Sequence, residues 1–434
     1  MILLKFFNYI NNLSNFPFIF ISPHVYAIGN CGEEIYFALL KARREKKKLI
    51  ILRPYELPWK FRFRITNQEL FNIDSDYRCF NKKNIFEDTI GRCLLTFVYA
   101  PFRIINLISS KFFKKKIKDI YIYPSIGEAV LWQTNKNLKK FSWERVRSFN
   151  WKKELNTYLP VRLRVDRHEK AEKIQKQMGI PLKDWFVCLH VREGGFHKDY
   201  ENSKARNASI GNYILAIKAI TNAGGWVVRM GDSTMTPLPV LERVIDYPHT
   251  PFKSDLMDIY LIKSCKFYMG SQSGIMDVAL LFQKPVLMPN MYHWFLCYPQ
   301  KKNDLGLIKH IYSHSRQRFL SVQDIFEEPW DILDLTKLGA DYEMTENTPE
   351  EIKDLVLEYL NAVNAGKKKY SVLQKEANRR RILQAHQIFK QRMFLTDDLY
   401  NKYRIASRIE SCVGALSKKY LESNWEKSSL DLNL

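Results

Sequence analysis

The sequence predicts an α/β protein with two domains, each built on a parallel β-sheet with helices on both faces. Apolar strand patterns and helix patterns alternate four times between residues 185 and 290, and this alternation is typical of a parallel sheet. Residues 17–54 repeat the order strand, helix, strand. A length of 434 residues, with 46% hydrophobic and 26% charged residues, fits two or three globular domains.

The first domain is predicted over residues 1–150. It begins with the apolar run PFIFIS at 17–22, which is followed by a loop that contains two glycines. The segment EEIYFALLKARREKKK at 33–48 has helical spacing and a basic last turn, which suits the negative end of the helix dipole. LIILRP at 49–54 is typical of the next parallel strand, and a further strand is expected from residue 119.

The second domain is predicted over residues 165–335, after a connection rich in charge and tryptophan. The helix RHEKAEKIQKQMG opens it and ends near Gly179. The runs WFVCLHVRE, GGWVVRMGD, KFYMG and PVLMPN are the predicted parallel strands. The helices expected between and after these strands cover residues 208–222, 238–243, 255–264 and 273–282.

Residues 336–434 are predicted to be a helical and basic extension with loose final residues. One helix start within it is clear. Thr348 is a capping residue, Pro349 suits the first turn, and Glu350 and Glu351 favour the positive end of the helix. No internal repeat of fixed period occurs along the chain.

The charge and cysteine content limit the protein's partners and location. The net charge of +22 predicts attraction to an anionic partner. The seven cysteines are scattered without a CxxC pair, which favours reduced thiols in a cytosolic protein. Asparagines interrupt the apolar N-terminus, and no uncharged apolar stretch reaches 18 residues. We therefore expect neither a secretion signal nor a spanning helix, and a cytoplasmic location.

One segment predicts contact with a membrane. Residues 93–118 are apolar for most of their length and end in a lysine cluster. Such a segment would lie in the interface of an anionic membrane, with its lysines on the headgroups and the protein held peripherally at the inner face. The alternative is a buried helix followed by a solvated basic turn.

Polar residues lie at the carboxyl ends of the predicted strands, which is where parallel sheets bind their ligands. His190 and Arg192 end the first strand on the same side, and Gly194 and Gly195 follow them. Arginine is the natural partner of phosphate because its planar fork donates two parallel hydrogen bonds and stays charged. The alternative is a structural arginine paired with a carboxylate.

A second turn of small residues strengthens the phosphate interpretation. Ser271, Gln272, Ser273 and Gly274 lie between a buried strand and a helix. A helix that starts in this way offers free N–H groups to an anion. The alternative is plain capping by serine, which is common at helix starts.

Three other loops contribute candidate residues. Arg206 and Asn207 begin a helix after the polar loop 197–204, which would either close over a ligand or be an ordinary solvent loop. Arg229, Gly231 and Asp232 end the second strand. The Asp232 carboxylate would accept from a ribose or sugar hydroxyl or cap a helix.

The glycine loop of the first domain is the candidate acceptor side. It contains Gly29, Asn30 and Gly32, followed by Glu33 and Glu34. One of these glutamates would be a catalytic base, and the alternative is that they favour the helix start electrostatically.

Several familiar signatures do not apply. The DxD at 74–76 does not follow a convincing buried strand, and His310 and His314 have neither an intervening Glu nor a third ligand. The sequence has no Walker A loop, GxGxxG, GxSxG or kinase motif. We expect no metal and no cofactor.

The HVRE, RNA, GGWVVRMGD and SQSG segments together resemble the C-terminal half of a GT-B glycosyltransferase. They are similar to GDP-fucose transferases that share an HxR motif, and they most resemble a bacterial group of surface-polysaccharide glycosyltransferases. The segment ADYEMTENTPEEI at 340–352 also resembles that group. The resemblance covers residues 17–52 and 180–362. It implies two Rossmann-like domains that face each other across a cleft.

The resemblance also implies roles for the candidate residues. Arg192 would hold the leaving diphosphate beside His190, and residues 271–274 would bind the phosphates. Arg229 and Asp232 would line the nucleotide cleft, with the glycine loop on the acceptor side. Fucosyltransferases usually have a second basic residue or an aspartate soon after HxR, whereas this chain has Glu193 and two glycines, which argues against fucose but not against sugar transfer.

The implied reaction moves a hexosyl or deoxyhexosyl group from a nucleotide-diphosphate sugar, with a GDP-sugar favoured, to a saccharide or lipid-linked saccharide. Arginine and helix N–H groups would stabilise the charge that develops on the departing diphosphate, so no metal is needed. A general base must deprotonate the acceptor hydroxyl. The candidates are Glu33, Glu34, Glu193 and Asp199, and the sequence does not choose among them.

Two alternatives to sugar transfer remain. The first is a transferase of the same fold that moves a polyol phosphate, which the same motifs permit. The second is a basic protein that binds nucleic acid. The basic runs flank helices and do not form a known nucleic-acid-binding fold, so no nucleic-acid partner is expected.

Overall fold

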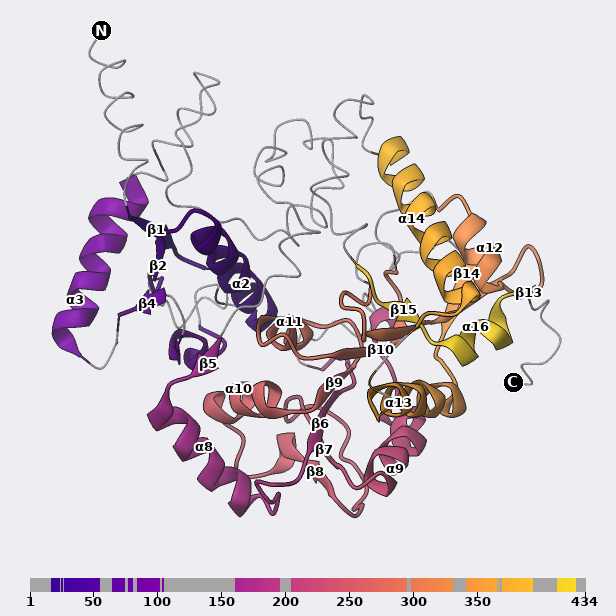
Figure 1. The fold of residues 1–434 in the computed structure, drawn as a ribbon, viewed down its shortest axis with the longest axis horizontal. Coiled ribbons are helices and arrows are strands. Elements are labelled where there is room, and N and C mark those ends of the chain that lie inside the picture. Colours follow the sequence, from indigo (N-terminus) through magenta and orange to yellow (C-terminus); the bar gives the residue numbers. More distant parts are fainter. Residues whose placement is uncertain are drawn as a thin grey trace, which may run out of the picture.

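The computed structural model describes residues 17–23, 25, 27–54, 65–74, 77–80, 84–101, 104, 161–195, 204–294, 298–330, 341–364, 366, 369–392 and 412–426. Two α/β units, each built on a parallel sheet, contact one another through helices α2 and α11 (Figure 1). The predicted fold class, α/β with two parallel sheets and covering helices, is confirmed.

The first unit contains a three-stranded parallel sheet in the order β1-β2-β4. Its strands are β1 (Phe18–Ile21), β2 (Lys48–Ile51) and β4 (Tyr77–Cys79). Helix α2 (Ile28–Arg44) covers one face of the sheet. Helix α3 (Ile85–Cys93) continues into the wider helical segment η4 (Leu94–Tyr99), which packs on the other face. The strand expected from residue 119 lies outside the described residues.

The glycine loop predicted before residue 33 is instead the first part of α2, which begins at Ile28. Contact with a helix of the second unit explains why this segment is helical. Gly29 and Gly32 face α11, and a Cβ atom built on Gly29 would lie 2.4 Å from the Cα atom of Gly274. Glycine weakens an isolated helix but permits this close approach, so the packing of two helices outweighs the local propensity.

The second unit contains a seven-stranded sheet in the order β15-β11-β10-β9-β6-β7-β8, and every pairing in it is parallel. The chain builds β6, β7 and β8 in one direction and then returns to the other side of β6 with β9. The junction of β6 and β9 is therefore the topological switch point of the sheet. The strands are β6 (Phe186–His190), β7 (Trp226–Arg229), β8 (Val244–Asp246), β9 (Phe267–Gly270), β10 (Val286–Met291), β11 (Leu305–Ile308) and β15 (Ala415–Leu416).

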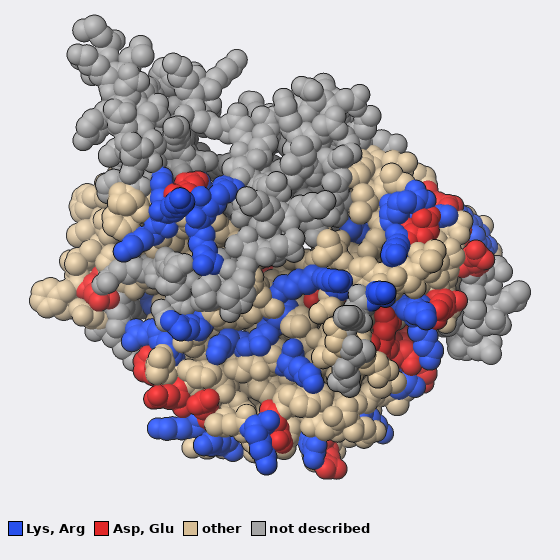
Figure 2. Space-filling model, in the orientation of Figure 1, with Lys and Arg blue, Asp and Glu red and all other residues tan. Residues whose placement is uncertain are grey.

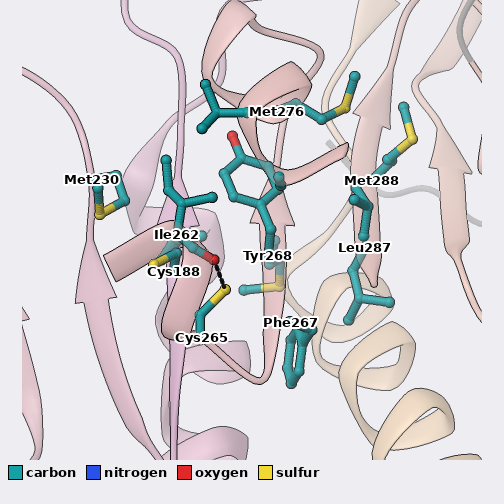
Figure 3. Close-up of a cluster of buried hydrophobic side chains, with 14 of the residues drawn as sticks. Cys188, Met230, Ile262, Cys265, Phe267, Tyr268, Met276, Leu287 and Met288 are labelled. Carbon is teal, nitrogen blue, oxygen red and sulfur yellow. Dashed lines mark hydrogen bonds between the residues drawn. The ribbon is translucent and has the colours of Figure 1, made fainter. Parts of the chain in front are cut away.

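Helices cover both faces of this sheet (Figure 1). On one side lie α9 (Ile214–Asn222) and α13 (Pro349–Asn364), and on the other lie α8 (Val165–Gln177), α10 (Asp255–Ser264) and α11 (Gly274–Leu281). Figure 3 shows the apolar layer between strands and helices, with Cys188, Phe267, Tyr268 and Leu287 fully buried. Because both faces are covered, the strands are apolar without alternation.

Two segments that were predicted to be helices have a different conformation in the structure. Residues 238–241 are irregular and 242–243 form a turn, and the Leu238 amide donates to the Asp246 carboxylate at 2.9 Å. The helix predicted from 208 begins as the 3-10 turn η6 (Ile210–Tyr213) and becomes α-helical in α9.

The described residues after 336 are part of the second unit and not a separate extension. β15 pairs with β11 at the edge of the main sheet, and α13 packs on that sheet. The predicted cap at Thr348 is confirmed, because its Oγ1 accepts from the Glu351 amide at 3.2 Å. The remaining elements of this region are β12 (His310–Ser313), β13 (Arg318–Phe319), α12 (Val322–Glu327), β14 (Tyr342–Thr345), α14 (Val372–Arg392) and α16 (Lys418–Asn424).

Polar contacts join the two units beside α10. The Asn67 side-chain amide donates to the Asp255 carbonyl at 3.0 Å, and the Gln68 amide donates to the Asp255 carboxylate at 2.8 Å. Arg167 of α8 binds the buried Glu69 through Nε at 3.0 Å. The short antiparallel strands β3 (Ile73–Asp74) and β5 (Arg162–Leu163) also pair across the units.

Two further sequence expectations bear on the described residues. Among the described residues, no disulfide bond joins the cysteines, which are Cys31, Cys79, Cys93, Cys188, Cys265 and Cys412. Within the described ranges, no helix combines the length and the apolar character needed to cross a bilayer.

Candidate functional site

The predicted HxR and SQSG motifs meet at the switch point of the seven-stranded sheet. His190 ends β6 directly opposite Gly270, which ends β9. The His190 imidazole Nδ1 lies 3.1 Å from the Ser273 hydroxyl, and the Arg192 amide donates to the Ser271 hydroxyl at 3.1 Å. Two motifs 80 residues apart in the sequence therefore form one hydrogen-bonded unit where ligands of parallel sheets bind.

His190 is held as a neutral imidazole. Burial, and after it the positive charge of Arg229, lower the pKa of His190 to about 4, against the opposite effect of Asp232. The ring is thus a neutral hydrogen-bonding group near pH 7 and adds no cation to the site.

This lowered pKa predicts a loss of stability in acid. The folded chain binds the His190 proton only near pH 4, whereas the unfolded chain binds it near 6.5. The stability that neutral His190 contributes is fully present above pH 6.5 and is lost as the pH falls toward 4. The total loss in the free energy of unfolding is roughly 3 kcal/mol. Urea unfolding from pH 7.5 to 4.5 should show a shallower pH dependence for His190→Gln than for the wild type. Parallel pH profiles would contradict the assignment.

Arg192 is part of a cationic group at the strand ends. Its side chain is 5% exposed, and its Nη1 donates to the Asn207 side-chain carbonyl. The ammonium of Lys309, directly after β11, donates to the Asn207 backbone carbonyl at 2.7 Å. Asn207 therefore bridges an arginine and a lysine that come from distant parts of the chain.

Lys309 was not among the residues predicted from the sequence. It is 2% exposed, and burial lowers the pKa of Lys309 to about 8, partly offset by Glu346. One signal was available in the sequence. The apolar run LGLI of β11 ends directly before Lys309, so Lys309 follows its strand as Arg192 follows β6 two residues after its end.

Arg206 completes the cationic group. Its guanidinium lies over the Tyr292 ring, 6.0 Å from the ring centroid. Its Nε is buried and has no hydrogen-bond partner within the described part of the chain. A buried donor without a partner is costly unless a ligand or water satisfies it, so Arg206 is a candidate ligand-binding residue.

The SQSG turn is packed more tightly than the sequence suggests. Ser271 and Gln272 are buried, and the Gln272 side-chain oxygen accepts from the Tyr292 and His293 amides at 3.1 Å. Gly274, the first residue of α11, contacts Gly29 of α2. Ser273 is half-buried and Gly274 is exposed, so α2 lies against the start of α11 without closing it off. Phosphate binding by residues 271–274 stays a prediction.

Arg229 belongs to a buried ion-pair network and not to an open surface. It is fully buried and binds Glu193 at 2.9 Å, Asp246 at 3.1 Å and the Thr236 carbonyl at 2.7 Å. Pairing with a carboxylate was the alternative expected for Arg192, and the structure shows it at Arg229 instead. The geometry does not support Arg229 as a nucleotide ligand.

Glu193 and Asp232 are also engaged within the protein. The Glu193 carboxylate accepts from Arg229 and from the Thr236 amide and hydroxyl at 2.8 and 2.9 Å. Asp232 accepts from the Thr234 amide at 3.0 Å and thereby closes a turn. Gly231, which directly precedes Asp232, has a φ of +149°, a backbone conformation that suits glycine. Glu193 in this arrangement holds Arg229 in place and is poorly suited to be a base.

The remaining candidate carboxyls within the described residues lie on α2 and α11, the two helices that pack together. Glu33 and Glu34 are buried within α2, and Asn30 is half-buried there. Asp199 lies outside the described residues, as does most of the loop 197–204. Asp277 in the first turn of α11 was not predicted, and burial raises the pKa of its carboxyl to about 7. A carboxyl poised near neutral pH is suited to general-base chemistry.

A site for a metal ion is not evident in the described part of the chain. There, no group of three or more His, Cys, Asp or Glu side chains is placed to hold one. Metal independence stays a prediction.

Comparisons with known proteins return structures but no sequence family. No protein-family model matches the chain, and no curated protein matches it. The glycosyl transferase family 9 protein from Veillonella parvula is 11% identical, with a TM-score of 0.38, over 79% of this chain and 98% of that one. E. coli ADP-heptose lps heptosyltransferase II is 13% identical, with a TM-score of 0.32, over 68% and 90%.

The chain is also similar to TibC, a dodecameric iron-containing heptosyltransferase that was solved in complex with ADP-D-β-D-heptose. The identity is 12% and the TM-score 0.32, over 63% of this chain. This chain spans 58% of the length of TibC.

Proposed function

We propose that the chain is a glycosyltransferase that uses a nucleotide-diphosphate sugar. The observation that supports it is the meeting of the HxR and SQSG motifs at the switch point of a parallel sheet, with Arg192 and Lys309 joined through Asn207. Buried cations at this edge suit a diphosphate, because their positive charge is poorly screened there.

The cationic group also suits the chemistry of transfer. Breaking the bond between the sugar and the diphosphate leaves negative charge on the departing oxygen. Arg192, Arg206 and Lys309 would stabilise that charge more strongly in the transition state than in the bound donor. His190 is neutral and would help to position the Ser273 hydroxyl.

The finer assignments are also part of the proposal. A GDP-sugar is the favoured donor, with a hexosyl or deoxyhexosyl group transferred to a saccharide or lipid-linked saccharide and no metal required. The HxR resemblance to fucosyltransferases supports the guanine nucleotide. Glu33, Glu34 and Asp277 are the described carboxyls that we propose as candidate bases.

The first test is nucleotide release from GDP-, UDP-, ADP-, dTDP- and CMP-sugars in EDTA. We expect slow hydrolysis of one donor by the wild type and a loss of about 100-fold or more in Arg192→Ala, the size typical of removing a donor to developing negative charge. Lys218→Ala, an exposed substitution in α9, is the matched control. If no donor is hydrolysed and none raises the melting temperature, the proposal fails.

A polyol-phosphate donor is distinguished in the same assay. Release of CMP from a CDP-polyol, without turnover of any nucleotide sugar, would replace sugar transfer by the alternative reaction.

A further inference from the structure

The outer side of α3 and η4 is an exposed apolar surface. Ile85, Phe86, Ile90 and Phe97 are 74%, 78%, 50% and 76% exposed, and Ile104 beyond them is 56% exposed. All five side chains face outward, whereas Leu95 and Tyr99 of the same helical segment are buried. We call these five residues the α3 apolar stripe.

The opposite side of the same helix is its packing side. Leu95 and Tyr99 are buried against Phe20, Ile50 and Leu52 of the first sheet. The helix therefore has one apolar side in the protein and a second apolar side facing outward, which is unusual for a helix on a protein surface in water.

Basic residues gather beside one end of this surface. Residues 41–48, at and just beyond the end of α2, contain six lysines and arginines, interrupted only by Ala42 and Glu45. Of these, Arg43, Arg44, Lys46 and Lys48 are exposed. Figure 2 shows the Lys and Arg side chains gathered over this part of the first unit.

The topology brings the basic run and the apolar stripe to the same edge of the sheet. α2 ends where β2 begins, at the amino-terminal edge of the parallel sheet. α3 follows β4 and runs back toward that edge, so η4 ends near it (Figure 1). The exposed Phe97 and the basic end of α2 are therefore at one end of the first unit.

We propose that the α3 apolar stripe, flanked by the basic end of α2, binds the surface of an anionic lipid bilayer with the helix lying in the plane of the interface. Apolar side chains would enter the boundary between headgroups and acyl chains, while the lysines and arginines contact anionic headgroups. A second copy of this chain fits less well, because symmetric contact would bring two basic runs together in a protein of net charge +22.

This inference does not depend on the proposed transfer reaction. The acidic residues of α3 do not oppose it strongly, because Asp88 is paired with Arg92 at 2.6 Å.

The test is co-sedimentation of the full chain with vesicles of phosphatidylcholine, alone or mixed with phosphatidylglycerol. The wild type should bind the anionic vesicles, and Phe86→Ser/Phe97→Ser should lower the partition coefficient by about ten-fold or more. Val240→Ser/Val372→Ser, at two residues that are 103% and 85% exposed in the second unit, should bind like the wild type. Arg43→Gln/Lys46→Gln should bind less tightly and respond less to salt.

Three outcomes would overturn the inference. They are a wild type that does not bind anionic vesicles, a phenylalanine variant that binds as well as the wild type, and equal binding to neutral and anionic vesicles. A dimer in light scattering that Phe86→Ser/Phe97→Ser dissociates would assign the surface to a second copy instead. Because the substituted side chains are exposed, unchanged melting temperatures should show that each variant is folded.

Discussion

Replacement of Arg229 by methionine should destabilise the second unit by about 3–5 kcal/mol, as expected when one member of a buried ion-pair network is removed. Arg229 is fully buried and holds Glu193 and Asp246. The methionine retains apolar volume but leaves two carboxylates without their cation. The free energy of unfolding in urea is the measurement, with nucleotide-induced shifts in melting temperature as a second readout.

A matched surface pair provides the control for this prediction. Arg164 and Asp166 are 3.2 Å apart with exposed side chains, so Arg164→Met should cost at most about 1 kcal/mol. The combination of Arg229→Met with Glu193→Gln and Asp246→Asn should recover part of the loss, because the buried charges then disappear together. An Arg229→Met variant as stable as Arg164→Met would show that the network contributes little.

The same substitution at two glycines of α2 should have opposite effects. A Cβ atom on Gly29 would lie 2.4 Å from the Gly274 Cα, which neither backbone can avoid without separating the helices. We expect Gly29→Ala to destabilise the chain by about 1–3 kcal/mol, the usual cost of overpacking. A Cβ atom on Gly32 meets the Val278 side chain at 3.5 Å, an ordinary contact. Gly32→Ala should therefore be neutral or stabilise by about 0.5–1 kcal/mol through helix propensity.

Thermal and urea unfolding of the two alanine variants would measure this difference. Donor-induced melting shifts would add a functional readout, because Gly29→Ala acts on the contact between α2 and the start of α11. Equal stability of the two variants would show that α2 and α11 do not pack in this way.

Local patterns in the sequence were sufficient for the central elements of the second unit. Apolar runs bounded by helix starts predicted β6, β7, β9 and α10, because strands buried on both faces require continuous apolar residues. The same pattern placed His190, Arg192 and Ser271 at strand ends. Their common location follows from parallel topology alone, since all carboxyl ends lie at one edge.

Local sequence patterns do not predict contacts between residues that are far apart in the chain. The glycines of α2 predicted a loop because isolated glycine disfavours helix, and only the contact with Gly274 reverses that preference. Arg192 and Arg229, at the ends of neighbouring strands, are equivalent in the sequence pattern. The structure distinguishes them, because Arg229 pairs with Glu193 and Asp246, whereas Arg192 donates to Asn207.

The sequence by itself determined the α/β class, the parallel strands and the edge at which the site lies, because these depend on periodicity and chain order. Only the tertiary structure decided which charges are neutralised, that Lys309 joins the site, and that α2 packs against α11. Such facts depend on side chains far apart in the chain, and burial and pairing set their charge only after the units have packed.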